Sequence, residues 1–147
     1  MWITLASTYS FYYNKEISSF NNLNDKSIIQ WHSNFDEAVA IAQKTGQPII
    51  FDVWAEWCVA CLEMKETTWK DKKLIDYINK NFIPVKLDYT NLPENVQLLL
   101  NRWEISGLPA VGYFKINSDF KGKPDILFQG YSSSNKLLKA SISIQSN

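Results

Sequence analysis

Residues 49–61, IIFDVWAEWCVAC, decide the fold of this chain. The first six of them form a short apolar run of β-branched and aromatic residues, which is typical of a buried central strand. Cys58 and Cys61 follow directly, and we expect a helix to begin at them. A CxxC pair alone is a moderate signal for redox chemistry. A buried strand, a CxxC pair and a helix in this order are a strong one.

The flanking residues predict alternating strands and helices. Asn34 and Glu37 form a capping box that opens a helix, and Gly46 suits its end. Pro93 suits the first turn of a helix that runs to about Trp103. The other expected elements are strands at 28–32, 82–89, 110–116 and 125–130, a helix at 71–81 that is separate or continues the CxxC helix, and a final amphipathic helix with Leu137, Leu138 and Ile142 on its apolar face.

The order of these elements predicts an α/β fold. Its βαβ first half implies parallel strands, and its last two strands imply an antiparallel hairpin. We therefore expect a central mixed β-sheet flanked by helices on both faces. The chain has 147 residues, which fits one domain with a hydrophobic core. Residues 14–27 are polar and rich in Asn and Ser, so we expect a linker or extension over 1–27 and the domain over 28–147.

Composition excludes several classes of function. Fifteen basic residues balance fifteen acidic ones, which gives no sign of a nucleic-acid partner. Two cysteines are too few for a disulfide-stapled secreted scaffold. Together with His32 they supply at most three ligands, whereas structural zinc needs four, so we expect no metal. Covalent haem attachment needs CxxCH, but Leu62 follows Cys61.

The start of the chain, residues 1–13, is mildly apolar. It lacks the basic region and small-residue cleavage site of a signal peptide. No stretch approaches the roughly 20 apolar residues of a membrane span. The segment fits either the trailing edge of a membrane segment or a loose end.

The two cysteines are expected to divide the chemistry between them. Unsatisfied N–H groups and the helix dipole favour a thiolate at the helix start, so Cys58 is the predicted attacking thiol. Cys61 lies one turn further on the same face. We expect Cys58 to be exposed and Cys61 to be more buried, where it resolves the mixed disulfide. The Cys58–Cys61 disulfide is then the only redox group required, with no separate cofactor.

Asp52 interrupts the apolar strand on the same face as Trp54. It is either a solvent-facing acid of an edge strand or, as we prefer, a buried carboxylic acid beneath Cys61. Burial would raise its pKa and let it exchange a proton with Cys61. Lys86, on the next strand, is either its partner or a solvated lysine.

The segment SGLPA, residues 106–110, precedes a strand. We expect a cis bond between Leu108 and Pro109. A cis-proline here would leave the preceding backbone free to pair with an extended substrate segment beside Cys58. Trp57 would line the same surface, or belong to the core.

These motifs resemble the thioredoxin superfamily. The closer resemblance is to the C-terminal thioredoxin-like domain of the thiol:disulfide interchange protein DsbD, over about residues 31–144. The motifs that carry it are WCVAC with the preceding Asp52, Ala55 and Glu56, then LDYTN, GLPA and QGY. The resemblance implies that Cys58 attacks, Cys61 resolves, Asp52 is the buried acid and Pro109 the cis-proline.

The chain also departs from that domain. Where DsbD typically carries an acid four residues after the second cysteine, this chain has Lys65. Glu63 is acidic but lies on another helix face, and Lys86 is more like ordinary thioredoxins. We expect these three residues to modulate the thiols. A cation at Lys65 near the helix start would favour the Cys58 thiolate, unless its side chain lies in solvent.

The resemblance implies a protein-disulfide reductase in the periplasm, either free-standing or tethered to the inner membrane as part of a larger protein. Its partners would be a membrane electron donor and a periplasmic acceptor on the route to disulfide isomerases and cytochrome c maturation proteins, and we expect a monomer. Two alternatives stay open: a free-standing thioredoxin-like reductase or oxidase, and a binding module with a structural disulfide. Val59 and Ala60 favour the relay over thioredoxins with Gly-Pro between the cysteines.

Overall fold

The computed structural model describes residues 26–146. Its four strands form one sheet in the order β2-β1-β3-β4. The central strand β1 (Ile49–Trp54) pairs in parallel with β2 (Ile83–Asp88) and antiparallel with β3 (Ala110–Phe114). β3 forms an antiparallel hairpin with β4 (Ile126–Gln129). The predicted mixed sheet, with a parallel first half and a terminal hairpin, is confirmed.

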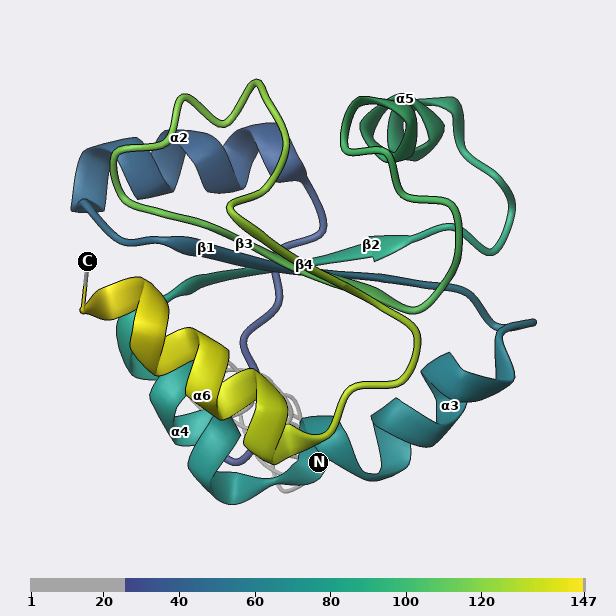
Figure 1. Cartoon of the computed structure of the whole chain (residues 1–147), viewed down its shortest axis with the longest axis horizontal. Helices are drawn as coiled ribbons and strands as arrows, with labels where there is room; N and C mark the ends of the chain where they lie inside the picture. The colour runs from purple at the N-terminus through teal and green to yellow at the C-terminus, as the bar shows by residue number, and fades with distance from the viewer. Residues whose placement is uncertain (1–25, 147) are drawn as a thin grey trace, which may run out of the picture.

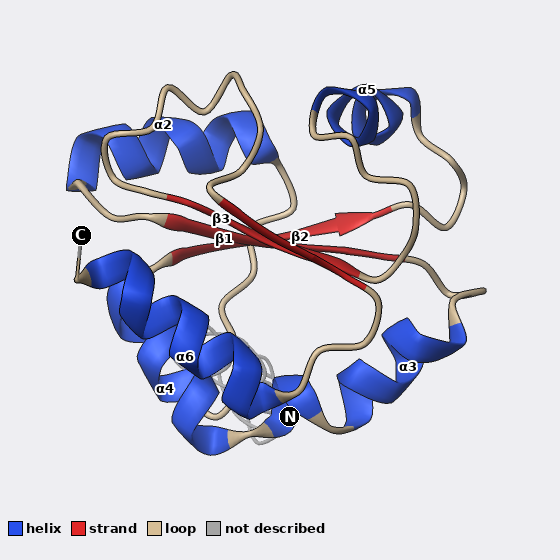
Figure 2. Cartoon of the chain, viewed as in Figure 1, coloured by secondary structure: helices blue, strands red, loops and turns tan. Residues whose placement is uncertain are grey.

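Helices cover both faces of this sheet (Figures 1 and 2). On one face lie α2 (Phe35–Thr45) and α5 (Glu94–Arg102). On the other lie α3 (Val59–Glu66), α4 (Lys72–Asn81) and α6 (Ser134–Gln145), with the short 3-10 helix η2 (Thr68–Lys70) between α3 and α4. The predicted helix at 71–81 is therefore a separate helix and not a continuation of the CxxC helix.

The sheet divides the buried side chains into two cores. Phe51 and Val53 of β1 pack with α2 and α5, whereas Ile50 packs with α4 and α6. This alternation follows from the two-residue period of a strand. It places Asp52 on the same side of the sheet as Ile50, facing the layer that contains α3.

Local signals explain where the helices begin and end. The Asn34 side chain accepts a hydrogen bond from the Glu37 backbone N–H at 3.1 Å and so caps α2. Gly46 ends α2 with a positive φ of 69°, which glycine adopts without a steric penalty. Pro93 occupies the N-cap of α5. The signals at Asn34 and Gly46 were expected from the sequence, whereas Pro93 was expected in the first turn of α5 and lies one residue before it.

The expected strand at 28–32 is wrong. Only His32 pairs with the sheet, through an isolated parallel bridge to Val85 at the outer edge of β2. The His32 N–H donates to the Pro84 carbonyl and the Lys86 N–H donates to the His32 carbonyl, each at 2.8 Å. The chain then turns at once towards α2, so the pairing does not extend.

The apolar face of α6 also differs from the prediction. Leu137 is buried and Leu138 is half-buried, but Ile142 is 46% exposed. Ile144 is buried in its place, together with Ala140 and Ser141.

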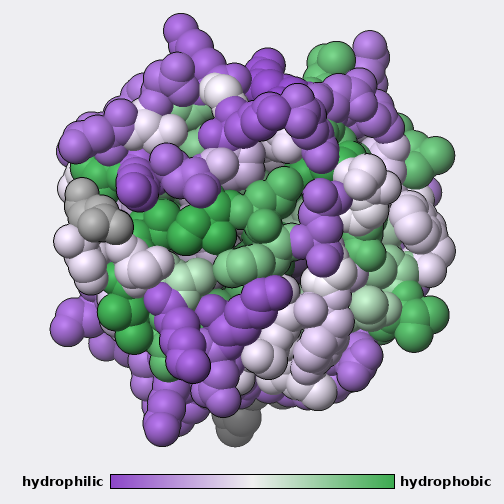
Figure 3. Space-filling model, in the orientation of Figure 1, coloured by the Kyte–Doolittle hydropathy of each residue, from purple (hydrophilic) through white to green (hydrophobic). Residues whose placement is uncertain are grey.

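Figure 3 shows hydrophobic surface at the level of the sheet between the hydrophilic helices, on the side where the half-buried edge strand β4 lies.

The predicted linker at 14–27 lies almost wholly outside the described residues. Its last two residues, Lys26 and Ser27, are exposed and form part of a turn. The boundary at Ile28 therefore stays a prediction. Within residues 26–146, no helix combines the length and the apolar character needed to cross a bilayer.

Candidate active site at the Cys58–Cys61 disulfide

The two cysteines form a disulfide at the start of α3. Cys58 is the N-cap residue of this helix, and its Sγ accepts a hydrogen bond from the Cys61 backbone N–H at 3.2 Å. Cys61 follows in the first turn, with a Cα–Cα distance of 5.2 Å between the two residues. The end of β1 and the start of α3 thus place one sulfur where an unsatisfied backbone N–H can stabilise negative charge.

Burial separates the two sulfurs only slightly in this disulfide form. Cys58 is 8% exposed and Cys61 is 4% exposed, and both pack against Ala55. Cys61 is the deeper of the two, as expected, but Cys58 is not openly exposed. The two side chains next to Cys58 in the chain are exposed, Trp57 by 57% and Val59 by 80%.

Asp52 is a buried acid of the central strand, with 2% of its surface exposed. The alternative of a solvent-facing acid on an edge strand is therefore wrong. Burial raises the pKa of Asp52 to about 6, while Lys86 and, less strongly, Trp69 lower it. A carboxyl group with this pKa can hold or release a proton near neutral pH. Its place beneath Cys61 stays a prediction.

Lys86 is the partner of Asp52. The two residues lie opposite one another in the parallel pairing of β1 and β2, and Lys86 Nζ lies 3.5 Å from Asp52 Oδ2. The lysine side chain is 22% exposed, so it is not freely solvated. Its ammonium group also lies 5.4 Å from the ring centroid of Trp31 and 5.2 Å from that of Trp54.

The loop before β3 approaches the disulfide. The Leu108–Pro109 bond is cis, as predicted, and Leu108 packs against the cluster of Ala55, Cys58 and Cys61. The loop is held by β4, because the Gln129 side-chain oxygen accepts hydrogen bonds from the Ser106 and Gly107 backbone N–H groups at 2.8 and 3.2 Å.

Trp57 and Leu108 line one cavity of about 300 Å³ beside the disulfide. The Trp57 indole N–H donates to the Thr90 carbonyl at 3.0 Å, which fixes the exposed ring over Tyr89. Its exposure excludes the alternative that Trp57 belongs to the core, while its contact with a substrate stays a prediction. The other lining residues are Tyr89, Gln97, Leu100, Ile105, Ser106 and Gly107.

Glu63 and Lys65 lie away from the start of α3. Both side chains are exposed, and Lys65 belongs to the last turn of the helix. The expectation that Lys65 lies near the helix start is wrong, because α3 has only eight residues and ends at Glu66. A cation in the last turn interacts with the negative end of the helix dipole, away from Cys58.

Sequence reasoning missed the aromatic residues around the ion pair, Trp31 and Trp69. They come from different segments, and no local pattern joins them to Asp52. The available signal was the number of tryptophans, six in the chain, which by itself does not say where each of them lies.

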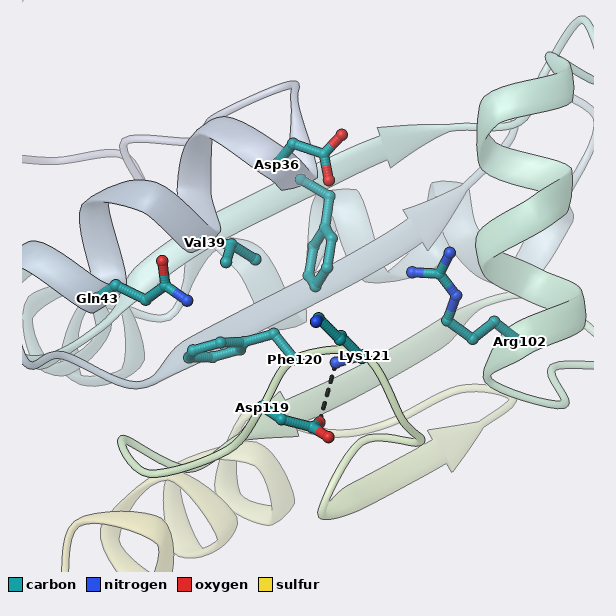
Figure 4. A pocket seen from close by; sticks show the side chains of 8 residues that line it. Asp36, Val39, Gln43, Arg102, Asp119, Phe120 and Lys121 are labelled. Carbon is teal, nitrogen blue, oxygen red and sulfur yellow. Dashed lines mark hydrogen bonds between the residues drawn. The ribbon is translucent and has the colours of Figure 1, made fainter.

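Away from the disulfide, the described part of the chain offers a second cavity but no metal site. No group of three or more His, Cys, Asp or Glu side chains within residues 26–146 is placed to share a metal ion. A cavity of about 500 Å³ opens on the α2 side of the sheet (Figure 4). It is lined by apolar, polar and charged side chains, namely Phe35, Asp36, Val39, Gln43, Arg102, Asp119, Phe120 and Lys121.

Curated relatives of the chain include the thiol:disulfide interchange protein DsbD. The DsbD of Ralstonia nicotianae is 34% identical over 82 residues, which cover 56% of this chain but 13% of the relative. The chain therefore corresponds to a small part of that protein.

Solved structures agree with the fold. The oxidised C-terminal domain of Neisseria meningitidis DsbD is 18% identical, covers 77% of this chain and 97% of its own, and has a TM-score of 0.61. A thioredoxin from Thermus thermophilus is 20% identical, covers 80% of this chain and 87% of its own, and has a TM-score of 0.67. The family model described as Thioredoxin-like matches residues 30–115. With the cysteines at the start of α3 and a mixed sheet between two helix layers, this match shows that the chain belongs to the thioredoxin-like family.

Proposed function

We propose that this chain is a thiol–disulfide oxidoreductase that passes electrons by dithiol/disulfide exchange through Cys58 and Cys61. More specifically, we propose that it acts as the C-terminal relay domain of a DsbD-like protein-disulfide reductase. The observation that carries the proposal is the Cys58–Cys61 disulfide at the N-terminus of α3, with Leu108 of the cis-proline loop packed against it. No cofactor other than this disulfide is required.

The chemistry begins with reduction of the Cys58–Cys61 disulfide. A thiolate of a donor dithiol attacks Cys58 Sγ, the S–S bond breaks, and Cys61 leaves as a thiolate. Asp52 in its acid form gives Cys61 a proton. The second donor thiol then attacks the mixed disulfide, which releases Cys58 and leaves the donor oxidised to a disulfide. Two electrons have moved to the chain, the proton on Cys61 has come from Asp52, and the two protons of the donor dithiol have passed to solvent.

The second half of the cycle passes the electrons on. Cys58 attacks the disulfide of an oxidised acceptor, and Cys61 resolves the mixed disulfide while its proton returns to Asp52. Trp57 and Leu108, which line one cavity beside the disulfide, would contact the acceptor. Pro109 would leave the neighbouring backbone free to pair with an extended acceptor segment.

The proposed partners follow from the similarity to DsbD. They are a membrane electron donor and a periplasmic acceptor on the route to cytochrome c maturation, with the chain in the periplasm, tethered to the inner membrane as part of a larger protein. We propose that it binds no nucleic acid and works as a monomer. The partners remain proposals because the Ralstonia relative is matched over 13% of its length.

A free-standing thioredoxin-like reductase or oxidase is the second candidate. The Asp52–Lys86 ion pair favours it, because a lysine at this position is more like ordinary thioredoxins. A binding module with a structural disulfide accounts less well for a buried acid whose pKa is about 6.

Two measurements on the same protein test the proposal. They are the reduction potential of the disulfide in a redox buffer and the turnover on a disulfide-containing protein. We expect a strongly reducing potential and turnover that needs both cysteines, with Cys58→Ala and Cys61→Ala as controls. An oxidising potential would favour an oxidase. A very low potential without turnover would indicate a structural disulfide and contradict the proposal.

A further inference from the structure

The ammonium group of Lys86 lies among three groups. Asp52 Oδ2 is 3.5 Å away, and the ring centroids of Trp31 and Trp54 are 5.4 and 5.2 Å away. Both ring distances are within the range of a cation–π interaction, which reaches about 6 Å. Two indole rings from different segments therefore lie within cation–π range of the ammonium group that pairs with Asp52.

Trp31 reaches this place through the segment before α2. The neighbouring His32 is fixed to the edge of β2 by its two backbone hydrogen bonds at 2.8 Å. On the other side, Ile29 is buried, and Asn79 of α4 accepts a hydrogen bond from the Gln30 N–H at 3.0 Å. The backbone on both sides of Trp31 is thus anchored to the domain.

A third indole, that of Trp69, packs against Trp31. Trp69 of η2 packs edge-on against Trp31 with 5.1 Å between ring centroids. It also makes a small contribution that lowers the pKa of Asp52. Asp52 Oδ1 has no hydrogen-bond partner among residues 26–146, so the ionised carboxylate depends chiefly on Lys86.

We propose that Trp31 is a positioning residue of the disulfide-exchange site, whose indole holds the Lys86 ammonium against Asp52. This rests on the proposed function, in which Asp52 exchanges a proton with Cys61. The segment before α2 then belongs to the site, although it touches neither sulfur in the contacts described.

Two acids of the elements on either side of β1 have partners of their own. Asp88 of β2 accepts a hydrogen bond from the Thr90 N–H at 2.8 Å, and Glu66 of α3 pairs with Lys70. Among the described residues, Lys86 is the charged group whose field lowers the pKa of Asp52. If Trp31 loses its aromatic face, Lys86 is freer to move into solvent, and burial then acts on Asp52 with less opposition.

The test compares three variants of the full chain by carbon-13 NMR titration of the Asp52 carboxyl group. Trp31→Leu keeps an apolar side chain but removes the aromatic face, and it should raise the pKa of Asp52 by about half a unit. Trp31→Phe keeps an aromatic face and should leave the pKa close to that of the wild type. Trp103→Phe changes a buried indole on the opposite side of the sheet and should lower stability without moving the pKa.

A second background shows whether Trp31 acts through Lys86. Lys86→Met should raise the pKa of Asp52 further than Trp31→Leu does, and adding Trp31→Leu to Lys86→Met should then have no additional effect. An unchanged pKa in Trp31→Leu, or an equal shift in both backgrounds, would overturn the proposal.

The rate of disulfide reduction by dithiothreitol, followed against pH, links the pKa to exchange. Its acid midpoint should move upward with the pKa of Asp52 in Trp31→Leu, and a midpoint that stays fixed while the pKa moves would contradict a role in exchange. Failure of the proposed function itself would be seen separately, as protein-disulfide turnover that persists in Cys58→Ala.

Discussion

The two sulfurs differ most in what surrounds them. Cys58 Sγ is the N-cap acceptor of α3, where a backbone N–H at 3.2 Å can stabilise a thiolate. Cys61 is the deeper residue, on the side of the apolar strand β1. A thiolate is disfavoured there until a mixed disulfide has formed nearby.

We therefore predict that Cys61→Ala accumulates a covalent complex with an oxidised partner, bridged through Cys58. Cys58→Ala should accumulate none, and neither variant should turn over. Non-reducing electrophoresis followed by peptide mapping identifies the bridged sulfur. Trapping through Cys61 in Cys58→Ala, at a rate like that of the reciprocal variant, would overturn the assignment.

Asp52 is expected to make stability depend on pH. Its pKa is raised from 3.8 to about 6 in the fold, so between these values the folded chain binds more protons than the unfolded chain. Stability should therefore fall as pH rises from about 4 to about 6, and then level off. The full cost of keeping this carboxylate buried and charged is about 2–3 kcal/mol above pH 7.

Asp52→Asn should remove this cost while slowing disulfide exchange. Urea unfolding of the oxidised proteins should show the variant more stable than wild type at pH 8, by up to about 2–3 kcal/mol, with the difference shrinking towards pH 4. Asp76→Asn, an exposed acid of α4, is the control and should show no such trend. A difference that is constant with pH would mean that the pKa of Asp52 is not raised.

At the scale of elements, the packing of β1 against β3 depends on the Phe51 ring, which lies over Gly112. Gly112 lies opposite Phe51 in the antiparallel pairing, and a Cβ at Gly112 would overlap the Phe51 ring. That ring cannot retreat, because it stacks on Trp103 with 4.3 Å between centroids. On the α2 and α5 side, the core thus has no room for a side chain at position 112.

Gly112→Ala should therefore destabilise the fold by about 1–3 kcal/mol, the usual cost of overpacking a core. Gly122→Ala is the matched control, because its added Cβ would meet only the Asp119 side chain at 3.9 Å. Thermal unfolding of the oxidised proteins measures both. Equal midpoints for the two variants would show that Phe51 has room to move.

Local chemistry explains which elements could be predicted from the sequence. The apolar run of β1, the Asn34 cap and Gly46 each act within a few residues, and the structure places all three as expected. The prediction of a strand at 28–32 was wrong because the pairing of this segment is set by the edge of β2, which is remote in the chain. Ile142 was wrongly expected on the buried face of α6 because α4, packed against α6, decides which face of that helix is buried.

The candidate site shows the same limit. Cys58, Cys61 and Pro109 belong to short motifs, and Asp52 was identified because a charge interrupts an apolar strand. Trp31 and Trp69 belong to no motif, since tertiary packing alone brings them to Trp54 and Lys86. Lys65 was misplaced because the end of α3 at Glu66 carries no clear stop signal.

For the whole molecule, we predict that a chain beginning at Ile28 folds and keeps the exchange rate of the full chain. The polar residues before it offer little apolar surface to bury. A chain beginning at Asn34 should instead lose at least about 2 kcal/mol of unfolding free energy, because it lacks buried Ile29 and the contacts of Trp31.

Urea unfolding and the rate of disulfide reduction should be compared for the two shortened chains and the full chain. Ile29→Ala in the full chain is the control for the buried side chain, since it keeps the rest of the segment. A substantial loss of stability in the chain beginning at Ile28 would show that the earlier residues belong to the domain and that its boundary is wrong.

The pairing of His32 with β2 also occupies part of the outer edge of the sheet. An outer strand with unpaired N–H and C=O groups is a template on which another polypeptide can add a strand. In this chain the Pro84 carbonyl and the Lys86 N–H already bond to His32, in the middle of the outer side of β2. One residue thus interrupts the row of free groups that a neighbouring molecule would need to extend the sheet from one copy to the next.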